Sequence, residues 1–131
     1  MIVIDASAVI ELLLATEAGA KVGEIVASDE VTLHAPHLVD LEVAQVLRRW
    51  TLAGKLALDR ASAALQDLAD LDLLSYPHDV LLPRIWELRA NISAYDASYL
   101  ALAEVLGADL VTLDRALRSV PGVRARVVVV S

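Results

Sequence analysis

The sequence lacks cysteine and phenylalanine, and it contains only two tryptophans and three tyrosines. Without cysteine, the protein can form no disulfide bond, no iron–sulfur cluster and no zinc site built on thiolates. No apolar run reaches the roughly 18 residues that a membrane-spanning helix needs. No basic segment precedes the first apolar residues, so we expect no signal peptide. These absences predict a cytoplasmic protein with no membrane segment.

Basic residues are also scarce, with 11 Lys and Arg against 18 Asp and Glu and a net charge of -7. This balance disfavours a general nucleic-acid-binding protein, which is usually basic. It does not exclude a nuclease, because bound metal ions can supply the positive charge. Acidic residues are absent after Asp114, and four arginines follow it: Arg115, Arg118, Arg124 and Arg126.

The sequence does contain regular alternation of apolar segments. Residues 2–4 are aliphatic and predict a buried strand, and Ser7 is suited to cap a helix over 7–15. Further helices are predicted at 17–27, 38–53, 59–72 (capped by Asp59), 83–91, 93–106 and 114–119, and further strands at 31–35, 73–76, 109–113 and 127–130. This alternation predicts the α/β class, as a single domain over 1–131 with an α/β/α sandwich around a mainly parallel sheet.

Four acidic residues are predicted to meet at one edge of this sheet: Asp5, Glu42, Asp96 and Asp114. Asp5 and Asp114 each follow an apolar strand, and ligands bind at the carboxyl edge of such sheets. Asp96 lies in the first turn of its helix, where the helix dipole favours an anion. Glu42 interrupts an apolar helical pattern. Each acid alone is equally well explained by structure, but their shared topology favours a functional site.

Four carboxylates at one edge would repel one another and take up protons unless a cation balanced them. A site with oxygen ligands and no sulfur suits hard divalent cations, so we expect Mg²⁺, with Mn²⁺ as an alternative. Such ions can activate water and stabilise the leaving oxygen in phosphodiester hydrolysis. The predicted chemistry is therefore metal-dependent hydrolysis of a phosphodiester.

The chain also resembles the PIN-domain family, and in particular the VapC toxins of bacterial toxin–antitoxin systems. The similarity lies in the segments IVIDASAVIELLL, LVDLEVAQVLRRW and ISAYDASYLALAEVLGADLVTLD and in the C-terminal hydrophobic strand. It implies a Mg²⁺-dependent endoribonuclease. Asp5, Glu42 and Asp96 match the three main acids of the family, and Asp114 matches its fourth, more variable acid.

The resemblance implies further features of the site and its partners. Ser7 and Thr112 match hydroxyl positions that support the acids through hydrogen bonds. The implied substrate is a structured RNA such as tRNA or ribosomal RNA. The implied partners are a VapB-like antitoxin and a second copy of the chain, and the helices between residues 38 and 72 could form a groove for the antitoxin. We also predict that Arg115 and Arg118, just beyond Asp114, contact the RNA backbone, although contacts with a partner are a competing use.

Two other readings are weaker. A non-catalytic PIN-like module that binds protein or RNA would be expected to lose some of the acids, and none is lost. A phospho-aspartate enzyme of the dehalogenase type needs an acid two residues after the nucleophile, where this chain has Ser7. Such an enzyme also needs a late lysine, whereas Lys21 and Lys55 are the only lysines here.

Other polar and aromatic residues are expected to have structural roles. Structural or solvent-exposed positions are predicted for His34, His37, His78, Asp40 and Glu104. Tyr95 precedes Asp96 and could stack on a base, but a half-buried position is the stronger expectation. Trp50 and Trp86 lie among apolar neighbours and are expected to pack in the core.

Overall fold

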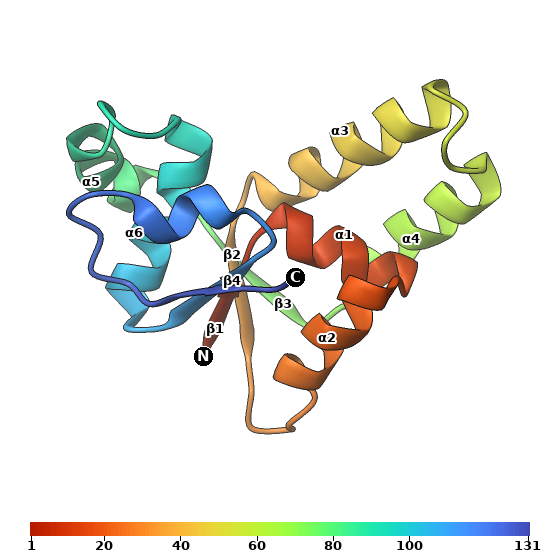
Figure 1. Ribbon diagram of the computed structural model, residues 1–131, viewed down its shortest axis with the longest axis horizontal. Coiled ribbons are helices and arrows are strands. Elements are labelled where there is room, and N and C mark those ends of the chain that lie inside the picture. Colours follow the sequence, from red (N-terminus) through yellow and green to blue (C-terminus); the bar gives the residue numbers. More distant parts are fainter.

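A computed structural model describes residues 1–131, and its centre is a five-stranded sheet (Figure 1). The strands follow the order β3-β2-β1-β4-β5, and every neighbouring pair is parallel. Their bounds are β1 Ile2–Ile4, β2 Leu33–Pro36, β3 Leu73–Tyr76, β4 Asp109–Thr112 and β5 Val127–Val129. The predicted parallel α/β sheet is therefore confirmed.

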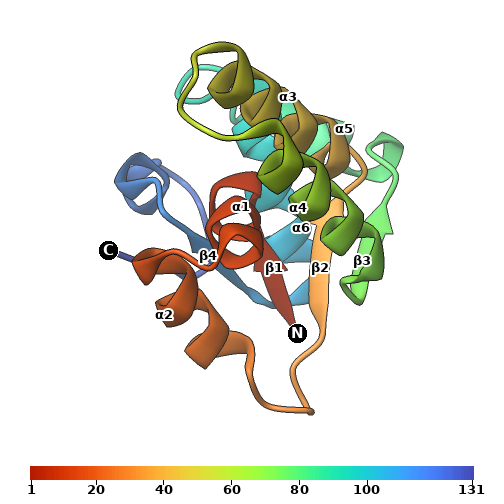
Figure 2. The same ribbon diagram turned by 90° about the vertical axis from the view of Figure 1, so that its right-hand side faces the viewer.

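Helices cover both faces of the sheet. They are α1 Ala6–Leu14, α2 Glu17–Val26, α3 Val39–Leu52, α4 Leu58–Asp70, α5 Leu82–Glu87 and α6 Ala94–Leu106, with the short 3₁₀ helices η1 Asp79–Leu81 and η2 Arg115–Ser119. Helices α1 to α4 lie on one side and α5 and α6 on the other, and α3 and α4 form an arm that extends past the sheet (Figures 1 and 2). No helix is long and apolar enough to cross a membrane.

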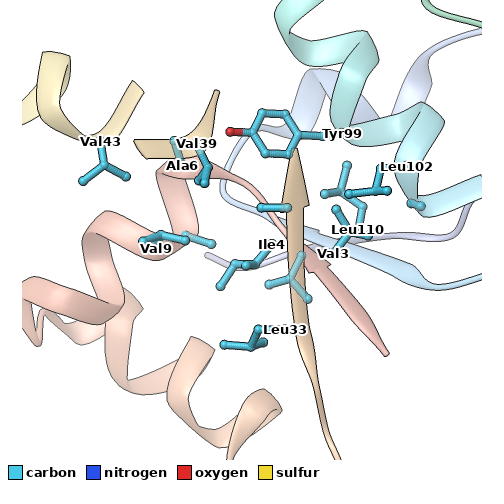
Figure 3. Packing of buried hydrophobic residues seen from close by; sticks show 14 of the residues in the cluster. Val3, Ile4, Ala6, Val9, Leu33, Val39, Val43, Tyr99, Leu102 and Leu110 are labelled. Carbon is cyan, nitrogen blue, oxygen red and sulfur yellow. The ribbon is translucent and has the colours of Figure 1, made fainter. Parts of the chain in front are cut away.

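The core is continuous through the central strands. Val3, Ile4 and Leu110 are fully buried, and α6 has seven consecutive buried residues from Ala97 to Ala103. Figure 3 shows this packing, with Val9 of α1 on one side of the strands and Leu102 of α6 on the other. Because β1 and β4 lie side by side at the centre, the residues that follow them emerge at the same edge of the sheet.

Several predicted boundaries are wrong for identifiable reasons. Ser7 does not cap α1, because Asp5 takes that position and accepts a hydrogen bond from the Ala8 amide at 3.1 Å. Asp59 does not cap α4, since the helix begins at Leu58 and places Asp59 in its first turn. Strand β2 begins two residues later than predicted and includes Pro36.

The C-terminal third also differs from the prediction in detail. The segment after Asp114 is a 3₁₀ helix, and the helix predicted at 83–91 ends at Glu87. Strand β5 is only half-buried, because it lies at the edge of the sheet.

Candidate active site

Asp5 is the most enclosed of the four acids, with 7% of its surface exposed. It ends β1, and its Oδ1 accepts hydrogen bonds from the Ser7 hydroxyl at 2.6 Å and from the Ala8 amide. Its Oδ2 accepts a hydrogen bond from the Thr112 hydroxyl. Burial raises the pKa of Asp5, and the nearby charge of Asp114 adds to this, while the three hydrogen bonds oppose it. The carboxylate is thus held in one position by donors from β4 and α1.

Ser7 and Thr112 also tie the ends of β1 and β4 together. The Ser7 Oγ accepts a hydrogen bond from the Leu113 amide at 3.1 Å, and the Thr112 Oγ1 accepts one from the Asp114 amide at 3.0 Å. Each hydroxyl therefore donates to Asp5 and accepts from the chain after β4. This arrangement fixes where the chain that carries Asp114 leaves the sheet.

Glu42 reaches the same place from the first turn of α3. Its Oε1 accepts a hydrogen bond from the Tyr99 hydroxyl at 2.6 Å, and Tyr99 itself is only 2% exposed. Burial raises the pKa of Glu42, and the charges of Asp96 and Asp5 raise it further, while the bond from Tyr99 opposes the shift. Burial and the adjacent Glu42 also raise the pKa of Tyr99, which keeps its phenol protonated as a donor.

Asp96 lies in the first turn of α6, one turn before Tyr99. Ser93 caps this helix, because its Oγ accepts a hydrogen bond from the Asp96 amide at 3.1 Å. Partial burial raises the pKa of Asp96, and the charges of Asp114 and Asp5 contribute in the same direction. Asp96 therefore shares an electrostatic environment with acids from two separate strand ends.

Asp114 differs from the other three because it is exposed. Its Oδ1 accepts a hydrogen bond from the Ala116 amide at 2.9 Å and so caps η2. The structure places all four acids on the lining of one pocket of about 630 Å³. The sequence pattern and the geometry thus agree on which acids lie together.

The side chains, as they stand, do not form a group of three or more ligands around a common point. The donors nevertheless suit a hard cation, because the acids and the two hydroxyls offer oxygen alone. Burial and the mutual repulsion of the acids both raise the pKa of Asp5, Glu42 and Asp96. A bound cation would relieve that repulsion, so the residues fit a divalent metal ion.

The pocket extends beyond the acids into a groove between α1 and α3. This part is lined by Ile10, Glu11, Leu41, Gln45, Val46, Arg49 and Trp50. The sequence analysis did not assign Gln45 or Arg49 to a site, although Glu42, Gln45 and Arg49 are spaced to share one face of a helix. It also overlooked Tyr99, because a tyrosine inside an apolar run is typical of core packing.

Two aromatic residues are more exposed than expected. Tyr95 is 66% exposed at the rim of the pocket, so the prediction of a half-buried position is wrong. Trp86 is 67% exposed, with the Arg89 guanidinium 4.8 Å from the centre of its ring, and therefore does not pack in the core. Trp50 is half-buried and packs against the core, in line with its prediction.

The remaining polar residues stand apart from the pocket. His34 is buried and lies 2.6 Å from the Tyr76 hydroxyl, and His78 accepts a hydrogen bond from the Leu38 amide, so both are structural. Glu104 is not on a solvated face, because it forms a bidentate ion pair with Arg84. Exposed positions outside the pocket are found for His37, Asp40, Arg115 and Arg118.

The PIN domain model matches residues 2–123. Ribonuclease VapC9 of Mycobacterium tuberculosis is 47% identical to this chain over 114 residues, which cover 87% of this chain and 86% of VapC9. The chain belongs to the VapC ribonucleases of the PIN-domain family. This membership confirms the predicted enzyme class, an endoribonuclease, and VapC ribonucleases are in general metal-dependent.

Solved structures show the same fold as this VapC ribonuclease. The crystal structure of PAE2754 from Pyrobaculum aerophilum superposes with a TM-score of 0.69 at 28% identity, over 96% of this chain and 81% of that chain. VapBC2 from Rickettsia felis, solved bound to a DNA fragment from their promoter, gives a TM-score of 0.73 at 15% identity over the whole of both chains.

Proposed function

We propose that this VapC ribonuclease cleaves RNA with one or two Mg²⁺ or Mn²⁺ ions held by Asp5, Glu42, Asp96 and Asp114. The observation that carries this proposal is the gathering of four acids from two strand ends and two helix starts in one pocket. Three of them have a raised pKa, the mark of a site that is short of positive charge. A bound ion would supply Lewis acidity and lower the pKa of water.

The residues of the chain divide the remaining work between them. Asp5 is held by Ser7, Ala8 and Thr112, so it presents a fixed oxygen ligand. A half-exposed carboxylate accepts the proton of the attacking water, because a raised pKa makes it a better base near neutral pH. No histidine lines the pocket, so imidazole takes no part in this proton transfer.

The proposal is tested by RNA cleavage in Mg²⁺, with Asp5→Asn as the site variant. Asp40→Asn is a matched control, since Asp40 is an exposed acid on α3 outside the pocket. We expect cleavage by the parent and by Asp40→Asn, and loss of cleavage in Asp5→Asn or with excess EDTA. Full cleavage in excess EDTA would overturn the metal mechanism.

We further propose that the protein is the toxin of a toxin–antitoxin pair in the cytoplasm, with a tRNA or ribosomal RNA substrate. Its relatives are named VapC ribonucleases, and the VapBC2 structure shows the same fold. The groove between α1 and α3 offers an apolar surface to a helical segment of a VapB-like antitoxin. A homodimer belongs to the same proposal. Inhibition of cleavage by the co-expressed antitoxin, and a dimeric mass in light scattering, are the expected results.

A further inference from the structure

The pocket is larger than its acids require. Its volume of about 630 Å³ falls in the range of sites that enclose an organic ligand, whereas metal ions and their waters would occupy only the acidic end. The other end is mostly apolar and is formed by α1 and α3. This end therefore has room for part of the substrate itself.

Helix α3 connects the two ends of the pocket. Glu42 and Arg49 are seven residues apart, which places them on the same face of the helix and roughly 10 Å apart along its axis. Both line the pocket. A group bound at Arg49 is thus well separated from the acids, at a spacing that suits a neighbouring nucleotide of one RNA strand.

Arg49 is the only basic residue among the 17 that line the pocket. Its side chain is exposed and forms no ion pair and no hydrogen bond, although Glu11 lines the same pocket. Glu11 is instead hydrogen-bonded to the Thr16 hydroxyl. The guanidinium is therefore free to bind an anion from outside the chain.

An RNA strand that enters a pocket with five acids meets repulsion, so each bound phosphate needs a local cation. Metal ions can meet this need only at the acidic end. At the other end Arg49 is the available cation, and the half-buried Trp50 next to it offers an aromatic surface to an unpaired base. Charge and surface here both match a single-stranded nucleotide.

We propose that the α1–α3 end of the pocket is a subsite for a nucleotide flanking the scissile phosphate, with Arg49 bound to its backbone phosphate and Trp50 against its base. This inference rests on the proposed ribonuclease function. It adds a phosphate contact that the sequence analysis had sought only at Arg115 and Arg118. An acidic segment of a protein partner is the competing occupant.

The test compares Arg49→Gln with Arg48→Gln, because Arg48 is the adjacent exposed arginine of α3 and does not line the pocket. Binding of a fluorescein-labelled, mixed-sequence single-stranded oligoribonucleotide is measured by anisotropy in Ca²⁺, from about 50 to 200 mM salt. Arg49→Gln should weaken binding about tenfold and reduce the slope of log K against log salt by about 0.7, the value for one phosphate contact on a single strand. Arg48→Gln should match the parent, and Arg49→Lys should recover part of the loss.

Cleavage of a long mixed-sequence RNA in Mg²⁺ is measured in parallel. Arg49→Gln should raise KM with little change in kcat, because a flanking contact binds the ground state and the transition state alike. Equal behaviour of Arg49→Gln and Arg48→Gln, with the parent active, would overturn the subsite and leave the ribonuclease function standing. Loss of antitoxin binding in Arg49→Gln with RNA binding unchanged would also overturn it, in favour of a protein contact. A parent that binds RNA through Arg49 but cleaves none would support the subsite and overturn the proposed function.

Discussion

Asp5 and Asp114 follow neighbouring parallel strands in the same way, yet their surroundings are opposite. Asp5 is buried and receives three hydrogen bonds, two of them from hydroxyl groups. Asp114 is exposed and accepts only the hydrogen bond with which it caps η2. The difference arises because β1 is flanked by strands on both sides and leads directly into α1, whereas the chain after β4 turns outward into a 3₁₀ helix.

This contrast suggests a division of labour within the site. A carboxylate held by three donors has little freedom and fixes the position of a bound ion. An exposed carboxylate can rotate toward that ion at little cost, which a pocket without preformed ligand geometry requires. Asp5 should therefore be essential to both fold and site, while Asp114 should adjust the site.

The largest effect is expected for Asp5→Ala. Cleavage should fall by more than about 10²-fold, because even partners of metal ligands cost 10- to 100-fold when removed. Stability should fall by about 1–3 kcal/mol, since the α1 cap is lost and the buried Thr112 hydroxyl loses its acceptor. Removal of a buried carboxylate with a raised pKa offsets part of this loss. RNA cleavage assays and urea unfolding measure the two effects, and unchanged cleavage would refute the central role of Asp5.

The second prediction concerns Asp96→Asn, which removes one charge while it preserves shape. Cleavage should be lost or gravely weakened, but the metal-free variant should be at least as stable as the parent, because repulsion from Asp114 and Asp5 is relieved. The dipole of α6 works in the opposite direction and stabilises the carboxylate by about 0.3–1 kcal/mol. Mg²⁺ should raise the melting temperature of the parent more than that of the variant. Equal Mg²⁺ shifts would make Asp96 a structural residue of the helix start.

The pH dependence of this pair follows from the raised pKa of Asp96. Above its folded-state pKa the carboxylate carries its full unfavourable interaction, and protonation removes that interaction as the pH falls toward the unfolded-state value of 3.8. The advantage of Asp96→Asn in EDTA should therefore be largest near pH 7 and shrink on acidification. The lowered pKa of His34 destabilises both proteins equally at low pH and cancels in the difference.

These variants bear on residues that sequence reasoning identified correctly. The strand-end pattern located Asp5 and Asp114, and the helix-start pattern located Asp96, because the carboxyl ends of parallel strands share one edge. The pattern could not distinguish the burial of Asp5 from that of Asp114. That difference depends on Thr112, which lies 107 residues from Asp5 in the chain and is joined to it only by the fold.

The errors have a similar origin in tertiary structure. Trp86 was expected in the core, but α5 has only six residues and buries Ile85 on one face, which leaves Trp86 outside. Tyr99 was overlooked because α6 is apolar over seven buried residues, so its periodicity does not show which residue faces the acids. Its function as a donor depends on Glu42, a residue of another helix.

The third prediction, Tyr99→Phe, breaks the bond that holds Glu42 while it keeps the aromatic ring in the core. Mn²⁺ affinity should fall about tenfold, as for other groups that orient metal ligands. Cleavage should fall by a similar factor at limiting metal and recover at high metal concentration. Isothermal titration with Mn²⁺ measures the affinity directly. Tyr76→Phe is the control, since the Tyr76 hydroxyl is paired with His34 away from the acids. An unchanged Mn²⁺ affinity would mean that Tyr99 only fills the core.

A smaller effect is expected for Asp114→Ala. The exposed side chain contributes one capping hydrogen bond to a short 3₁₀ helix, so stability should change by less than about 1 kcal/mol. Cleavage should fall less than in Asp5→Ala, and excess Mg²⁺ should restore part of it. Parallel urea unfolding and cleavage assays at several Mg²⁺ concentrations make the comparison. Losses as large as those of Asp5→Ala would contradict the division of labour between the two aspartates.

The smallest effect is expected beside Asp114, where Arg115 and Arg118 are exposed on η2. If the RNA backbone approaches the pocket from this side, replacing both by Gln should reduce the slope of log K against log salt by about 0.7 for each lost phosphate contact. The kcat should stay the same, because such contacts position the strand without taking part in the reaction. Arg126→Gln is the control, since Arg126 precedes β5 at the opposite edge of the sheet and lies 3.8 Å from Asp109 in a weak ion pair. Anisotropy titrations of the oligoribonucleotide in Ca²⁺ give the slopes. A double variant with the slope of Arg126→Gln would mean that the RNA does not cross η2, and the exposed side of Asp114 would then face solvent or a protein partner instead of the substrate.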